Sequence, residues 1–412
     1  MDKLKFLPYG RQHVTEADIA AVCEVLKSDW LTQGPAIVDF EHALADRLGV
    51  QETVACSSGT AALHLSMLAL GIGPGDAVIT TPNTFAASAN CARFVGTDVY
   101  FADIDPENGL IEPDSIARIL KKDTAKKIKA IIPVHFAGQP ADLPAINDLA
   151  KKHGAWVVDD ACHAIGATYN YEGQTYRIGN NPHSDMTVFS FHPVKHVAMG
   201  EGGAITTNLP ETADRLRLFR SHGISRESKI NEDMALNSEG MPNPWYYEMV
   251  ELGFNYRLTD IQATLGIQQL KRLEWSLEKR RELAGIYCRL IQEEFTNGEV
   301  RPLINKTEVE NAYHLFVIQI DFEKLGVSRA AVMNQLRAKG IGTQVHYIPV
   351  HLQPYYQRNC GTKPGDCPNA EAYYEKALSL PMYPNLADDD IKRVVDELVA
   401  VLMKSHEKKY TV

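Results

Sequence analysis

The sequence predicts an α/β fold in which a large domain with a mostly parallel central sheet is followed by a smaller α+β domain. Three observations predict it. Between about residues 50 and 210, short apolar runs alternate with amphipathic stretches. A long, charged, helix-prone stretch follows at Thr259–Phe295, and a mixed set of strands and helices comes after it. The chain has 412 residues with 45% apolar side chains, which is enough for two or three domains with a large core.

The candidate strands of the large domain are short apolar runs bounded by turn residues. They are Thr53–Cys56, Ala77–Thr81, Val99–Asp103, Ala130–Val134, Trp156–Asp159, Met186–Phe191 and Ala204–Thr207. Stretches of helical character between several of them include Thr60–Leu70, Phe85–Phe94, Asp142–His153 and Glu211–Ser221. Because strands alternate with helices, we expect a mostly parallel sheet covered on both faces.

The stretch Thr259–Phe295 marks the passage to the second domain. An average helix has about 11–12 residues, and a much longer one usually links domains. We therefore predict a large domain over residues 1–265 and a smaller one over 266–412. The smaller domain should contain a strand, an N-capped helix, an extended run and two closing helices, at Tyr313–Ile320, Ser328–Lys339, Val345–Val350, Asn369–Leu378 and Asp388–Lys404.

The composition excludes several classes of protein. Lys and Arg number 42 and Asp and Glu 52, so the formal charge is −10, which argues against a nucleic acid or an anionic membrane as partner. No segment has the roughly 18 consecutive apolar residues of a membrane helix. The seven cysteines are scattered, so we expect reduced thiols in a cytoplasmic protein. Cys360 and Cys367 are close in sequence but lack a second Cys/His pair, and no metal site is expected.

An anion site is predicted where the first strand meets its helix. Ser58, Gly59 and Thr60 form a small-residue turn before an apolar, and therefore buried, helix. Free N–H groups and the helix dipole favour an anion at such a helix start. A simple N-cap explains the same residues, and that alternative stays open. The glycine fingerprints of dinucleotide-binding and P-loop proteins are absent from the sequence.

A carboxylate and an amine are expected at the same edge of the sheet. Asp159 and Asp160 end an apolar strand, and they point to opposite faces, so only one should face a ligand. Lys195 follows another buried strand among apolar and glycine-rich neighbours, which favours a partly desolvated, nucleophilic amine. Each residue alone has an ordinary structural explanation. Together with the anion site and the aromatic ring of Phe85, they form the set that a pyridoxal phosphate site needs.

These segments resemble the DegT/DnrJ/EryC1/StrS family of sugar aminotransferases, which have fold type I of the pyridoxal-phosphate enzymes, like aspartate aminotransferase. The resemblance covers nearly the whole chain. The similar segments are Ser57–Leu63, Pro133–Gln139, Asp159–His163, Ser190–Lys195, Gly200–Gly203 and Gly253–Asp260. Ser190–Lys195 and Val345–Val350 are most similar to the pseudaminic acid branch, which aminates C4 of a UDP-linked 4-keto-6-deoxy-N-acetylhexosamine.

The resemblance implies a role for each matching residue. Lys195 would bond to the cofactor aldehyde and carry the proton, Asp160 would pair with the pyridinium nitrogen, and His163 would lie against the ring. The other residues that would contact pyridoxal phosphate are Ser58, Gly59, Thr60, Phe85, Ser190 and Asn255. Of these, Asn255 would reach the cofactor of a neighbouring subunit, which implies a homodimer with shared active sites. Substrate contacts are implied for Arg257, His346 and Tyr347.

Departures from the family pattern bear on the reaction. Asp159 stands where the family usually has Glu, which we interpret as a harmless outward change. Met199 and His196 replace residues common beside the cofactor. The dehydratase branch has His in place of the Schiff-base lysine, and since Lys195 is present here, transamination is favoured over dehydration.

The expected reaction moves an amino group from L-glutamate, leaving 2-oxoglutarate, to the UDP-linked keto-sugar. Alternatives are another UDP- or dTDP-linked keto-sugar, a catalytically silent protein that binds pyridoxal phosphate, and a nicotinamide-dependent oxidoreductase, which the missing glycine fingerprint disfavours. Arg226 is a weaker candidate than Arg257 for binding substrate anions. His64, His135 and His222 are expected to be structural, and Trp245–Tyr247 to form a dimer surface or a sugar-stacking wall.

Overall fold

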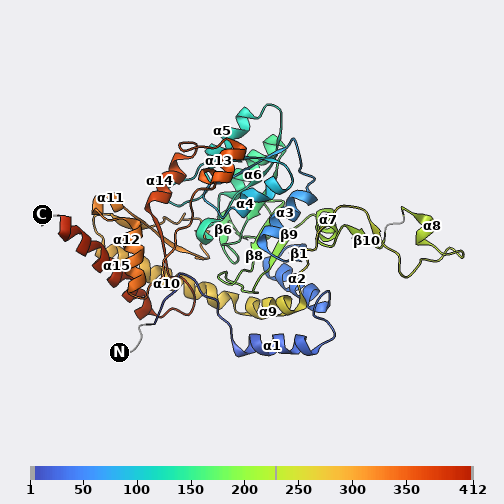
Figure 1. The fold of residues 1–412 in the computed structure, drawn as a ribbon, viewed down its shortest axis with the longest axis horizontal. Helices are drawn as coiled ribbons and strands as arrows, with labels where there is room; N and C mark the ends of the chain where they lie inside the picture. The colour runs from blue at the N-terminus through green and yellow to red at the C-terminus, as the bar shows by residue number, and fades with distance from the viewer. Residues whose placement is uncertain (1–4, 228–229, 410–412) are drawn as a thin grey trace.

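The computed structural model describes residues 5–227 and 230–409, and its centre is a seven-stranded sheet (Figure 1). The strand order is β1-β9-β8-β5-β4-β2-β3. Only β9 runs antiparallel to its neighbours, so the sheet is mostly parallel, as predicted. The strands are β1 (Glu52–Cys56), β2 (Ala77–Thr80), β3 (Asp98–Phe101), β4 (Ile128–Ile132), β5 (Trp156–Asp160), β8 (Met186–Ser190) and β9 (Gly203–Thr207).

Helices cover both faces of this sheet, because alternate strand residues point to opposite sides. Val158 belongs to the apolar cluster on one face and Val157 to the cluster on the other. The first face is covered by α3 (Gly59–Ala69), α4 (Ala87–Phe94) and α7 (Pro210–Arg220). The second is covered by α2 (Pro35–Leu48), α5 (Pro113–Lys122), α6 (Leu143–His153) and α9 (Asp260–Lys271), with α1 (Glu16–Lys27) packed outside α9.

The C-terminal part is a smaller α+β unit with its own apolar core. An antiparallel sheet of β12 (Val300–Pro302), β14 (Phe316–Ile320) and β15 (Ala377–Leu380) packs with α10 (Leu273–Glu294), α12 (Arg329–Ala338) and α15 (Asp388–Lys409). Leu7 from the N-terminal segment joins this core, and its N–H donates to the Gly340 carbonyl at 2.8 Å. The division at residues 265 and 266 stays a proposal.

The remaining elements are short. They are a hairpin of β6 (Thr168–Tyr171) and β7 (Gln174–Arg177) paired with β13 (Val309–Glu310), the helices α11 (Phe322–Leu325), α13 (Pro354–Cys360) and α14 (Pro368–Lys376), and the 3₁₀ turns η1 (Phe136–Gly138) and η2 (Val350–Leu352). Within residues 5–227 and 230–409, no helix has both the length and the apolar character needed to cross a membrane.

An arm projects from the body after α7 (Figure 1). It contains β10 (Ile224–Ser225), α8 (Glu232–Ala235) and β11 (Glu248–Met249), and β10 pairs antiparallel with β11 at its base. The arm and its base expose large apolar side chains, including Ile230, Met234, Met241, Trp245, Tyr247, Met249 and Leu252.

Three sequence predictions for the later elements are wrong in detail. Thr259–Phe295 is two helices, because Arg272 leaves helical geometry at φ −105° and ψ 5°. No glycine or proline marks this break; the Arg272 guanidinium instead bonds to Asp18 of α1 at 2.6 Å. The predicted helix Asn369–Leu378 ends early, and its last residues open β15 against β14. Val345–Val350 is not a strand, and Val350 begins η2.

Candidate active site

The carboxyl ends of β5 and β8 lie side by side, with the start of α3 against them. Gly59 at this start is closely surrounded: a Cβ atom there would lie 2.9 Å from the Cβ of Ser190 and 3.2 Å from the Sγ of Cys162. A side chain at position 59 would therefore fill the space between the helix start and β8. The backbone of Gly59 and the hydroxyl of Ser190 border one small cradle.

The N-terminus of α3 has the features of an anion site. Ser58 is its N-cap, and the Ser58 Oγ accepts the N–H of Ala61 at 3.1 Å. This bond confirms the N-cap interpretation, yet it leaves free the first helical N–H groups, at Gly59 and Thr60, which have no partner within their own helix. The helix is buried almost all round, so its dipole is poorly screened. The cap and the anion site are compatible.

The adjacent carboxylates of β5 face opposite sides of the sheet, as predicted. Asp160 faces α4, and its Oδ2 accepts the Ser88 hydroxyl at 2.6 Å while its Oδ1 accepts the N–H of Cys162 at 3.1 Å. The prediction that Asp159 points outward to solvent is wrong. Asp159 is fully buried and accepts bonds from His135 Nε2 at 2.9 Å and Thr187 Oγ1 at 2.8 Å.

The amine of Lys195 lies in the same region. Its Nζ is 3.4 Å from Nε2 of His314. Burial lowers the pKa of Lys195, and the neighbouring acidic groups of Cys162 and Asp160 oppose that shift only in part. An amine with a lowered pKa is more often neutral, and only the neutral form attacks a carbonyl carbon.

His163 has ring partners on both sides but an unused nitrogen. Its ring centroid is 4.4 Å from that of His314, and its Nε2 is 3.3 Å from the Tyr347 hydroxyl. Its Nδ1 is buried without a hydrogen-bond partner in the part of the chain that the structure describes. Burial and the neighbouring Lys195 hold the pKa of His163 well below its usual range, so the ring is neutral.

The other predicted ring and substrate contacts gather beside His163. The Phe85 ring is 62% exposed and lies 6.4 Å from the Tyr347 ring, so one of its faces is open to a ligand. His346 is buried, and its Nδ1 lies 2.8 Å from the Ser379 hydroxyl. Burial, followed by the charge of Lys195, lowers the pKa of His346 to about 3.

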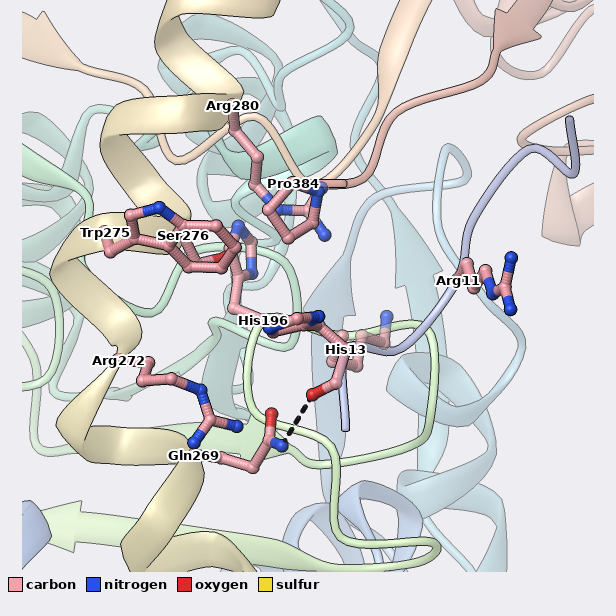
Figure 2. A pocket seen from close by; sticks show the side chains of 10 residues that line it. Arg11, His13, His196, Gln269, Arg272, Trp275, Ser276, Arg280 and Pro384 are labelled. Atoms are coloured by element: carbon pink, nitrogen blue, oxygen red, sulfur yellow. Dashed lines mark hydrogen bonds between the residues drawn. The ribbon is translucent and has the colours of Figure 1, made fainter. Parts of the chain in front are cut away.

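A small pocket lined in part by Lys195 lies between the α9–α10 boundary and the N-terminal segment (Figure 2). Arg280 is buried in its wall, and its Nη1 donates to the carbonyls of Tyr313, His314 and Met382. Burial lowers the pKa of Arg280 to about 9. Because Arg280 fixes the backbone of His314, it also fixes the neighbour of the Lys195 amine. Other lining residues are Arg11, His13, His196, Gln269, Arg272, Trp275, Ser276 and Pro384.

Asn255 and Arg257 make no hydrogen bond or ion pair with Lys195 in the part of the chain that the structure describes. Asn255 is exposed and pairs with Ser221, while Arg257 is half-buried. The carbonyl of Tyr256 between them accepts the Ser57 N–H at 2.8 Å, which places this segment beside the start of α3. Arg226 is exposed in the arm, away from this group.

The geometry assigns structural contacts to several other residues. His135 is fully buried against Asp159, and the His64 ring packs against Phe94, Phe254 and Tyr256. His196 is buried beside the His314 ring, and its Nε2 bonds to the Ala312 carbonyl at 2.8 Å. Met199 packs in the core of the second sheet face, and the space at Gly266 of α9 is filled by its sulfur.

Sequence reasoning missed Ser88 and His314. Ser88 lies one turn along from Phe85 in a helix with no motif of its own, and His314 precedes an apolar strand. Ser88 meets Asp160 and His314 meets Lys195 through contacts between segments that are remote in sequence, so no local signal could have identified them.

The assembled groups fit pyridoxal phosphate. A partly buried amine suits the aldehyde, the Asp160 carboxylate suits the ring nitrogen, and the cradle at Gly59 and Ser190 suits the phosphate. The unused Nδ1 of His163 supplies a further polar contact for a ligand.

Comparison with known proteins shows the family of the chain. The model of the DegT/DnrJ/EryC1/StrS aminotransferase family matches residues 12–399. The chain is 41% identical over 392 residues to the spore coat polysaccharide biosynthesis protein SpsC of Bacillus subtilis, covering 95% of this chain and 96% of that protein. It is 40% identical over 407 residues to an uncharacterised protein of Methanocaldococcus jannaschii, covering 98% and 100%.

Solved structures show the same fold. Helicobacter pylori PseC, an aminotransferase involved in the biosynthesis of pseudoaminic acid, superposes with a TM-score of 0.85 at 30% identity, covering 97% of this chain and 100% of that one. The PLP-form of the putative sugar aminotransferase Spr1654 from Streptococcus pneumoniae gives a TM-score of 0.84 at 27% identity, covering 97% and 99%. This chain is therefore a sugar aminotransferase of the DegT/DnrJ/EryC1/StrS family.

Proposed function

We propose that the chain is a pyridoxal-phosphate enzyme that transfers the amino group of L-glutamate to C4 of a UDP-linked 4-keto-6-deoxy-N-acetylhexosamine. The observation that carries this proposal is the Lys195 amine, whose pKa burial lowers, in one buried cluster with Asp160 and the start of α3. The similarity to PseC, an aminotransferase of pseudoaminic acid biosynthesis, supports this acceptor.

The cofactor would supply an aldehyde that exchanges amines and a ring that accepts electrons. Gly59, Thr60 and Ser190 would hold its phosphate, with Ser58 keeping the helix start in place. Asp160 would bind the ring nitrogen. His163 and Phe85 would lie against the ring, and Asn255 of a second subunit would complete the phosphate site.

Lys195 would act as the acid and base. Its neutral amine takes a proton from the α-carbon of the amino donor and returns one to C4 of the sugar. His314 lies 3.4 Å from that amine and, because its own pKa is lowered well below the usual range by burial, can accept a hydrogen bond from it. Arg257, His346 and Tyr347 would contact the nucleotide sugar or the donor.

We further propose a homodimer with shared active sites. The arm after α7 carries Trp245, which is 74% exposed, and Leu252, which is 76% exposed. Exposed apolar side chains gathered on one projecting segment mark a protein interface. We propose that a second copy of this chain covers these side chains, since the same contact would bring Asn255 of one subunit to the cofactor phosphate of the other.

The test compares Lys195→Ala with Lys324→Ala, an exposed lysine of α11. Both proteins are purified with pyridoxal phosphate, and their visible spectra and their amination of a panel of UDP- and dTDP-linked keto-sugars are measured, the latter by mass spectrometry. We expect Lys195→Ala to lose both the lysine-linked absorbance and turnover while Lys324→Ala keeps them. If Lys195→Ala kept both the absorbance and the turnover, Lys195 could not be the nucleophile.

A second acceptor is favoured by a specific observation. SpsC, at 41% identity, is named for spore coat polysaccharide, so another UDP- or dTDP-linked keto-sugar is the alternative. In the same panel, amination of a different keto-sugar would support this alternative over the UDP-linked 4-keto-6-deoxy-N-acetylhexosamine. A catalytically silent role is disfavoured, because Lys195, Asp160 and Ser190 are all present at one edge of the sheet.

A further inference from the structure

Two hydroxyl side chains form a chain that ends on Asp160. The Ser88 Oγ lies 2.6 Å from Oδ2 of Asp160, and the Thr84 Oγ1 lies 2.7 Å from the Ser88 Oγ. Thr84, Ser88 and Asp160 are 3%, 0% and 5% exposed, so water does not compete for these bonds. All three side chains lie at the edge of the sheet where α4 begins.

The direction of this chain follows from the proton count. A serine hydroxyl has one proton to donate. Its possible acceptors are the Asp160 oxygen at 2.6 Å, the Thr84 Oγ1 at 2.7 Å and the Phe85 carbonyl at 3.4 Å, and the bond to the charged oxygen is the strongest. Ser88 therefore donates to Asp160, which leaves its oxygen free to accept the hydroxyl proton of Thr84.

Both oxygens of Asp160 accept hydrogen bonds, and the Ser88 hydroxyl is the side-chain donor among them. Its other oxygen accepts the Cys162 N–H at 3.1 Å, and no arginine or lysine makes an ion pair with it among residues 5–227 and 230–409. Hydrogen bonds donated to a carboxylate stabilise its ionised form. In a buried pair of a carboxylate and a ring nitrogen, such bonds decide on which partner the shared proton rests.

We propose that Ser88, supported by Thr84, is a positioning residue that holds the Asp160 carboxylate in place against the ring nitrogen of the cofactor, so that the proton stays on that nitrogen. The inference rests on the proposed use of pyridoxal phosphate. A protonated ring withdraws electrons from the reacting carbon, so the hydroxyl chain acts on the chemistry through Asp160.

The adjacent carboxylate offers a matched control. Thr187 donates its hydroxyl to Asp159 at 2.8 Å, in the same strand pair but on the opposite face of the sheet. Thr187→Val removes an equally buried hydroxyl from a carboxylate that does not face the cofactor. Ser88→Thr keeps the hydroxyl and serves as the conservative variant.

The experiment loads wild type, Ser88→Ala, Ser88→Thr and Thr187→Val with pyridoxal phosphate labelled with ¹⁵N in the ring. The ¹⁵N chemical shift is recorded against pH, and exchange of the glutamate α-proton is timed in D₂O. We expect Ser88→Ala to move the signal toward that of an unprotonated ring and to slow exchange by roughly tenfold to a hundredfold, the range for one hydrogen bond to a charged group. Ser88→Thr and Thr187→Val should keep the wild-type shift.

A Ser88→Ala protein with the wild-type nitrogen shift and exchange rate would overturn the proposal. Should Ser88→Ala fail to fold, Thr84→Val gives the same test, with a smaller change expected in the same direction and an unchanged shift counting against the proposal. The proposed function fails separately, since wild type would then show no bound cofactor signal at all.

Discussion

Replacing His135 by leucine tests the buried contacts behind β5. His135 is fully buried; its Nδ1 accepts the Ala141 N–H at 2.9 Å, so its only ring proton is on Nε2 and goes to Asp159. His135→Leu takes one of two donors from a buried carboxylate and leaves the Ala141 N–H without an acceptor. A lost bond to a charged group and an orphaned donor together cost about 3 kcal/mol.

The measurement is the thermal midpoint followed by circular dichroism. At about 2.1 cal/mol/K per residue, unfolding of 412 residues as one unit has an entropy of about 0.9 kcal/mol/K. The expected loss therefore lowers the midpoint by about 3–4 °C. His135→Gln, whose amide can still donate to Asp159, should lose less.

The control is Arg289→Ala, which removes a surface ion pair with Glu293 whose side chains are 60% and 56% exposed. Its midpoint should change by about 1 °C or less, because exposed pairs contribute little. If the thermal midpoint of His135→Leu fell no further than that of the Arg289→Ala control, the reasoning that Asp159 depends on the His135 donor would be refuted.

Three further results are expected. Gly59→Ala should weaken binding of pyridoxal phosphate, followed by fluorescence titration, by about tenfold or more, because the new Cβ would lie 2.9 Å from Ser190 Cβ. Gly285→Ala, in an open position of α10, should instead stabilise the protein by about 0.5–1 kcal/mol and leave that affinity unchanged. Stability should fall as pH drops below about 6.5, by about 1.4 kcal/mol per pH unit for each histidine kept neutral by burial, because the unfolded chain takes up protons there. For His346 the loss continues toward its folded pKa of about 3, and His346→Gln should flatten the pH profile of the thermal midpoint. Trp245→Asp should shift sedimentation toward the monomer, and a protein that keeps the sedimentation coefficient of wild type would place the dimer contact elsewhere.

The central sheet could be predicted because its strands are buried on both faces. Such strands are continuous apolar runs, and each predicted run corresponds to a strand between β1 and β9. Asp160 and Lys195 could be identified for the same reason, since each follows one of these runs. The side of Asp159 was also predictable from the two-residue period of a strand, but its burial was not, because His135 and Thr187 come from other strands and turns.

Other features depend on contacts that no local pattern encodes. The segment before β15 has the composition of a helix, and the chain becomes extended at Ala377 because β14, far back in the sequence, offers its edge. Arg272 ends α9 through a bond to Asp18 of another helix. The His314 ring lies beside Lys195, and its carbonyl is bound by Arg280 of α10. In each case the deciding partner is remote in sequence.

The position of Leu7 has a consequence for how the chain is made. Leu7 exchanges bonds with the backbone of Gly340 and Gly342, at 2.8 and 2.7 Å, and its side chain completes the C-terminal core. A ribosome releases the N-terminal segment long before it builds that core. Leu7 can therefore dock only after residues near Gly340 have been synthesised, so this contact closes late, and a substitution at Leu7 should weaken the C-terminal core although it lies far away in sequence.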